Sequence, residues 1–167
     1  LAAAGRALVD ALEAASGAER LGIIGTLGVR RETGAVPALA KMVAAAGRPG
    51  PDGAQGADGD LAAVGAAAAS SLGEIDHAEA LAALERAWGG SAGPLRDALG
   101  DALLRHANRK LAAGDRREAR RIFQQVHENE NEGHLRTAAF QGVIRAAGDD
   151  GLPLLLAALS GPKEDAR

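Results

Sequence analysis

The densest group of residues that could do chemistry is a run of cationic side chains in residues 105–121. This run holds seven cations and two carboxylates in a chain whose formal net charge is −3. Guanidinium forks suit the paired oxygens of phosphate and carboxylate, so this anion patch could hold a phosphate, an acidic peptide or an anionic surface. The competing interpretation is a solvated helix face whose aliphatic stems cover apolar surface. The cations are Arg105, Arg109, Lys110, Arg116, Arg117, Arg120 and Arg121.

Other polar groups in the sequence match no catalytic or metal-binding motif. The acidic segment from His127 to His134 fits neither a helical i, i+4 ligand pair nor an established zinc motif. A Gly-rich loop with Asp52, Asp58 and Asp60 lacks the ligand order and the closing Glu of an EF-hand. No Ser lies at a recognisable spacing from a His and a carboxylate. We therefore predict no catalytic residue, no metal and no cofactor.

The elements that must position these side chains are helices, because apolar residues recur at helical spacing along most of the chain. The clearest case is LGIIGTLGVRRETGAVPALAKMVAA, residues 21–45, which predicts two short antiparallel helices. Pro37 lies near the start of the second helix, where its missing N–H costs nothing. No segment alternates apolar and polar residues as a half-buried strand does, so we expect an all-α protein.

This helix pair recurs in altered form along the chain. When the sequence is aligned with itself at an offset of 45 residues, Leu27-Gly28 aligns with Leu72-Gly73 and Leu39 aligns with Leu84. A shift of 116 residues places Val36, Pro37 and Leu39 on Leu152, Pro153 and Leu155. Helix pairs that repeat in register and cannot bury their apolar faces alone are typical of an α-α superhelix, so we predict a solenoid of about four pairs.

We expect the whole chain, residues 1–167, to form a single solenoid fragment. We expect Leu39 and Leu84 to be core residues, and Trp88 to lie at the end of an apolar helical stripe in the core. The expected parts are a leading helix at 1–16, repeat 1 at 18–46, a flexible loop at 47–60, repeat 2 at 61–88, repeat 3 at 94–128 and repeat 4 at 134–160.

The turn and proline pattern LGVRRETGAVPAL, with weaker copies LGEIDHAEALAAL and IRAAGDDGLPLLL, resembles HEAT repeats, in particular the bacterial PBS-lyase HEAT-like kind. The third pair, with Ala119 and Phe123 after Gly114-Asp115, resembles a tetratricopeptide unit. The resemblance implies a right-handed HEAT/armadillo-type solenoid whose second helices line a concave face. It also implies a binding or scaffolding role more often than catalysis.

If second helices line the concave face, four polar residues lie opposite the apolar stripes of their helices: Lys41, Arg86, Arg121 and Gln125. We predict that they form a mildly basic groove that binds an acidic or polar segment of a partner protein, in a scaffold without catalysis of its own. The alternatives are a regulatory or substrate-positioning module of a larger enzyme, including a HEAT-like lyase, or anion or nucleic-acid binding through the anion patch.

Composition narrows the partner classes. A sequence pI near 5.8 disfavours nucleic acid, and aromatics for base stacking are scarce at 2%. The longest uncharged run, residues 61–73, is shorter than the roughly 20 residues of a membrane helix, so we expect no membrane span.

The first segment resembles the second helix of a pair, so we expect an internal slice of a longer array that could associate end to end. The sequence does not indicate a compartment.

Overall fold

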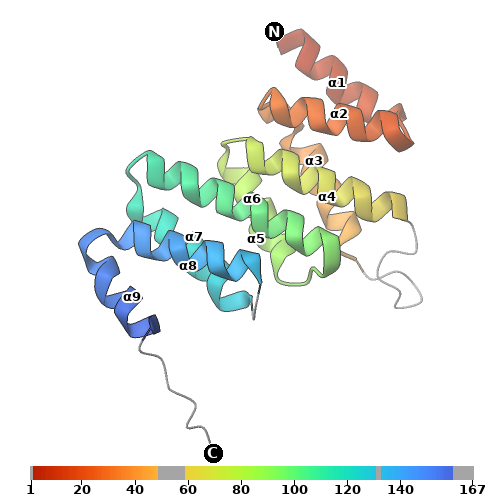
Figure 1. The fold of residues 1–167 in the computed structure, drawn as a ribbon. Helices are drawn as coiled ribbons and strands as arrows, with labels where there is room; N and C mark the ends of the chain where they lie inside the picture. Colours follow the sequence, from red (N-terminus) through yellow and green to blue (C-terminus); the bar gives the residue numbers. More distant parts are fainter. Residues whose placement is uncertain (1, 49–58, 131–132, 160–167) are drawn as a thin grey trace, which may run out of the picture. The chain divides into compact units, whose positions relative to one another are not determined.

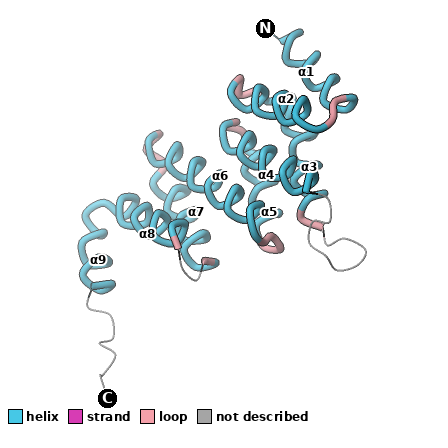
Figure 2. Tube along the Cα trace, turned by 45° about the vertical axis from the view of Figure 1, so that its right-hand side comes forward, coloured by secondary structure: helices cyan, strands magenta, loops and turns pink. Residues whose placement is uncertain are grey.

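The computed structural model describes residues 2–48, 59–130 and 133–159 of the 167-residue chain (Figure 1). Every regular element within these ranges is a helix, as Figure 2 shows, so the all-α prediction is confirmed. The elements are α1 (Ala2–Ala14), α2 (Gly17–Val29), the 3₁₀ turn η1 (Thr33–Ala35), α3 (Val36–Ala46), α4 (Gly59–Glu74), α5 (Ala78–Trp88), α6 (Gly93–Ala112), α7 (Arg116–Asn129), α8 (His134–Ala147), the 3₁₀ turn η2 (Gly148–Asp150) and α9 (Gly151–Leu159).

Local sequence explains where several helices begin. Pro37 lies in the first turn of α3, where no intrahelical N–H is required. Asp115 caps α7, because its carboxylate accepts a hydrogen bond from the backbone N–H of Glu118 at 3.2 Å. His77 caps α5 in the same way through Nδ1 and the N–H of Glu79, at 3.3 Å.

The predicted loop at 47–60 ends too late. Gly59 and Asp60 already belong to α4, whose interior is rich in Ala, the strongest helix former. The rest of that loop, including Asp52 and Asp58, lies mainly outside the described residues.

The chain forms two compact units, a first unit at Leu1–His106 and a second unit at Ala107–Arg167, with the boundary inside α6. In the first unit, α2 packs on α1 and α4, while α3 packs on α4 and α5. In the second unit, α8 packs on α7 and α9. Each of these helices therefore contacts its first or second neighbour in the sequence.

The first unit has a core of aliphatic side chains from consecutive helices. Leu39 and Leu84 are fully buried and Trp88 is 2% exposed, so the three core predictions are confirmed. The second unit buries one face of α7, which consists of Ala119, Ile122, Phe123 and Val126.

α9, which aligns in sequence with α3, differs from α3 in burial. Leu152 and Leu155, which align with the buried Val36 and Leu39, are 62% and 36% exposed. α9 packs on α8 and η2. The alignment therefore matches buried residues of α3 with exposed residues of α9.

Small residues bring α2, α4 and α6 close together at matching positions in the first unit. A Cβ atom added to Gly28 of α2 would lie 2.7–2.9 Å from atoms of Ser71 in α4. A Cβ atom added to Gly73, the predicted copy of Gly28, would lie 2.8–3.0 Å from Ala102 in α6. Two glycines that the sequence alignment pairs thus make the same kind of close contact with a neighbouring helix.

Candidate functional site

One concave surface in the first unit is a groove of about 500 Å³ lined by α3 and α5. Its floor consists of small residues, because Ala and Gly predominate where the two helices meet. We call this surface the α3/α5 groove. It is lined by Ala40, Lys41, Val43, Ala44, Gly47, Arg48, Ala83, Arg86, Ala87 and Gly90.

Three cations lie around this groove, and none of the described residues that line it is acidic. Lys41, Arg48 and Arg86 are all exposed, and Arg86 Nε donates to the carbonyl oxygen of Ala82 at 3.1 Å. That bond holds the Arg86 stem along its own helix. The groove therefore combines a small-residue floor with a positive rim, which suits a narrow, negatively charged segment.

Sequence reasoning identified Lys41 and Arg86 and missed Arg48. The missed residue lies just beyond the end of α3, seven positions after Lys41. Residues seven apart lie close to the same face of a helix, so this spacing was a usable signal.

Arg121 and Gln125, the other two predicted groove residues, belong to α7 in the second unit. They contact each other, since Arg121 Nη1 donates to Gln125 Oε1 at 3.2 Å. Arg121 also holds Glu118 through two bonds, Nε to Oε2 at 2.9 Å and Nη2 to Oε1 at 2.7 Å. The hydrogen bond from Arg121 lowers the pKa of the Glu118 carboxyl below its ordinary value.

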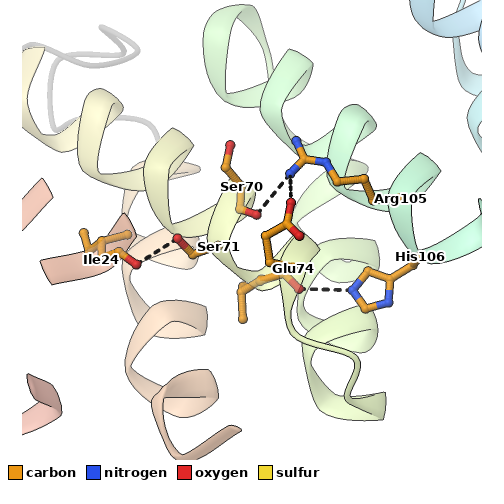
Figure 3. Close-up of polar contacts among 7 residues, drawn as sticks. Ile24, Ser70, Ser71, Glu74, Arg105 and His106 are labelled. Atoms are coloured by element: carbon orange, nitrogen blue, oxygen red, sulfur yellow. Dashed lines mark hydrogen bonds and ion pairs between the residues drawn. The ribbon is translucent and has the colours of Figure 1, made fainter. Parts of the chain in front are cut away.

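The residues of the predicted anion patch do not all make the same kind of contact in the structure. Arg105 belongs to the first unit, where Nη1 pairs with Glu74 Oε1 at 3.0 Å and donates to the Ser70 carbonyl at 3.3 Å (Figure 3). Arg109 and Lys110 are half-buried in the last turn of α6. The remaining members, Arg116, Arg117, Arg120 and Arg121, line one cavity in the second unit.

Buried polar side chains in the first unit join neighbouring helices. Ser71 Oγ donates to the carbonyl oxygen of Ile24 at 2.9 Å, and His106 Nε2 lies 3.1 Å from the carbonyl oxygen of Leu72 (Figure 3). These contacts connect α2 with α4 and α4 with α6. Both side chains thus satisfy backbone groups in the core, which is a structural role.

The segment from His127 to His134 also has a structural explanation. Arg136 Nη1 donates to the backbone carbonyl oxygens of His127 and Glu130, at 3.1 and 2.6 Å, at the end of α7. The His127 ring packs on Phe140 with centroids 5.3 Å apart. No group of three or more His, Cys, Asp or Glu side chains in the described parts of the chain is placed to hold a metal ion.

Comparisons with protein-family models, curated proteins and solved structures find no significant match. Among the helices that the structure describes, none has the length and apolar character needed to cross a membrane.

Proposed function

We propose that this chain is part of a HEAT-type α-solenoid that acts as a non-catalytic scaffold and binds an acidic segment of a partner protein in the α3/α5 groove. The observation that carries the proposal is the presence of Lys41 and Arg86, from two successive second helices, in one groove with Arg48. Electrostatic complementarity of this kind speeds association and selects partners of opposite charge.

The repeated contact between first helices supports the solenoid part of the proposal. Gly28 meets Ser71 and Gly73 meets Ala102, so helices that occupy the same place in successive repeats pack through small residues in the same register. Neighbour-to-neighbour packing along the chain is the contact pattern of repeat proteins.

The groove chemistry favours a binding role over the alternative of an enzyme module. Acid–base catalysis needs titratable groups placed together in a cleft. The described residues that line the α3/α5 groove include Lys41, Arg48 and Arg86 but no His, Asp, Glu or Ser. These cations suit carboxylate recognition.

The test is binding of a fluorescent Glu-rich peptide to the whole chain, measured by anisotropy beside a Lys-rich peptide of equal length. We expect saturable binding of the acidic peptide only. The double reversal Lys41→Glu and Arg86→Glu should weaken it by roughly tenfold or more, which corresponds to about 1.4 kcal/mol.

The matched control is the double reversal Arg6→Glu and Arg30→Glu. It changes the net charge equally at exposed positions of α1 and the end of α2, away from the groove. Equal loss of binding in both variants would show that net charge, and not the groove, attracts the peptide. That result would refute the proposal.

A further inference from the structure

One face of α7 is built from arginines. Arg116 and Arg120 lie four residues apart, as do Arg117 and Arg121, so the two pairs form adjacent rows on the helix surface. The opposite face, with Ala119, Ile122, Phe123 and Val126, is buried in the second unit. The cations therefore point away from the core as a group.

These arginines line a cavity of about 420 Å³ between α7 and the end of α8. Its other lining residues are Gln124, Ala146 and Ala147, and no carboxylate is among the described residues that line it. The small Ala side chains of α8 leave room beside the guanidinium groups. The cavity thus has donors on one wall and little steric bulk on the other.

The charges in this cavity are only partly compensated. Arg121 is held by Glu118, and the charges of Lys110 and Arg117 also act on the Glu118 carboxylate, whereas Arg116 and Arg120 have no carboxylate partner among the described residues. The carboxylate of Asp115 accepts the N–H of Glu118 at the helix cap. Arg116 and Arg117 also occupy the first turn of α7, where the positive end of the helix dipole disfavours cations. A bound anion would relieve this repulsion.

We propose that this cavity is a binding site for a compact phosphate group, the dianion of a phosphomonoester. Planar guanidinium forks bind phosphate oxygens in pairs, and residues four apart on a helix are about 6 Å apart, which suits one phosphate held between the two arginines of a row. The site is separate from the α3/α5 groove and does not depend on the proposed scaffold function.

Two features favour a compact phosphate over a nucleic-acid strand. Asp149 and Asp150 follow Ala147 after one intervening residue, Gly148, and are exposed, so a long polyanion that extended past the cavity would meet negative charge. The aromatic side chains that could stack on bases are engaged elsewhere, since Phe123 is buried and Phe140 packs on His127.

The test is isothermal titration calorimetry of the whole chain with inorganic phosphate and with phosphoserine, at constant ionic strength. We expect saturable binding with one site per chain. The double variant Arg116→Gln and Arg120→Gln should weaken it by roughly tenfold or more. The matched control Arg6→Gln and Arg30→Gln, which removes the same charge at exposed positions of α1 and the end of α2, should bind as the unmodified chain does.

Two further measurements make the result decisive. Circular dichroism should show the same helix content in both variants, because the replaced side chains are exposed or half-buried at the surface. The charge-conserving variant Arg116→Lys and Arg120→Lys should bind more weakly than the unmodified chain but better than the Gln variant, because a lysine keeps the charge and loses the fork.

The proposal would be overturned by no saturable heat with either probe, by equal affinity in the Gln variant, or by equal loss in the control. Tighter binding of a single-stranded oligonucleotide than of phosphoserine would also overturn it, in favour of a nucleic-acid surface. If a phosphoserine peptide binds more tightly than phosphoserine itself, the phosphate belongs to a protein segment. Equal affinity assigns it to a small molecule.

Discussion

Single glycines determine how closely the helices of the first unit approach. In α2, Gly28 contacts Ser71, whereas Gly25 has no atom within 4 Å of an added Cβ. Both are helical glycines three positions apart, so they differ mainly in what lies opposite them. A comparison of substitutions at these two glycines therefore distinguishes the cost of a close contact from the general effect of glycine on a helix.

We expect Gly28→Ala to destabilise the chain by about 1–3 kcal/mol, because the new methyl group would overlap Ser71, including its backbone Cα atom. Gly25→Ala should stabilise it by about 0.5–1 kcal/mol, since alanine loses less backbone entropy in a helix. Urea unfolding followed by circular dichroism measures both. Equal effects of the two substitutions would contradict the close contact between α2 and α4.

Leu39 of α3 and Leu84 of α5 are core residues with no exposed surface. Replacement of either by Ala removes buried methyl groups and leaves a cavity, so we expect a loss of about 2–5 kcal/mol in the free energy of unfolding. Lys41→Ala, on the exposed face of α3, is the control and should change it little. A negligible effect at both leucines would show that the helix faces are assigned wrongly.

At the scale of the element, α7 combines a cap, an ion pair and an arginine face within a few turns. The hydrogen bond from Arg121 holds the pKa of Glu118 below its ordinary value in the folded chain. A depressed folded-state pKa stabilises the fold above the pKa of the unfolded chain, and this contribution is lost as the pH falls through the folded-state pKa.

We therefore expect an NMR titration to find the Glu118 carboxyl more acidic than an ordinary glutamate. Arg121→Gln should raise that pKa toward the ordinary value, because it removes the main hydrogen-bond donor. The Arg121–Glu118 ion pair contributes little to the free energy of unfolding, about 0.2–0.5 kcal/mol, since the Glu118 side chain is 33% exposed. An unchanged titration in the variant would exclude Arg121 as the cause.

The candidate sites also belong to the scale of the element. Lys41 and Arg86 were predictable, because each position on its helix is set by local periodicity and the structure places both in one groove. The contacts of the anion patch were less predictable, since the spacing of its residues in the sequence does not show which distant side chains they pair with. Arg105 pairs with Glu74, which is distant in sequence, while Arg116, Arg117 and Arg120 line a cavity whose other wall comes from α8.

At the scale of the whole molecule, burial is uneven along the chain. The central helices of the first unit contribute fully buried residues such as Ile24, Leu27 and Leu72, whereas α9 exposes Leu152 and Leu156 at 62% and 54%. Local opening is easier where fewer apolar groups are buried.

We predict that amide hydrogen exchange will be slowest in α2, α3 and α4 and markedly faster in α9. The physical reason is that opening α9 exposes little additional apolar surface, while opening α4 disrupts contacts with α2, α3 and α5 together. Mass spectrometry of exchange in the whole chain tests this. Protection in α9 as strong as in α4 would mean that another surface covers the exposed leucines.

The sequence by itself determined the helices, most of their ends and the buried face of each central helix, because periodicity, proline position and capping residues act within a few turns. Only the tertiary structure decided which small residues touch, that Arg48 joins Lys41 and Arg86, and that α9 leaves its aligned leucines exposed. These outcomes depend on contacts between residues far apart in the chain, where the geometry of packed helices and not local propensity selects the neighbour.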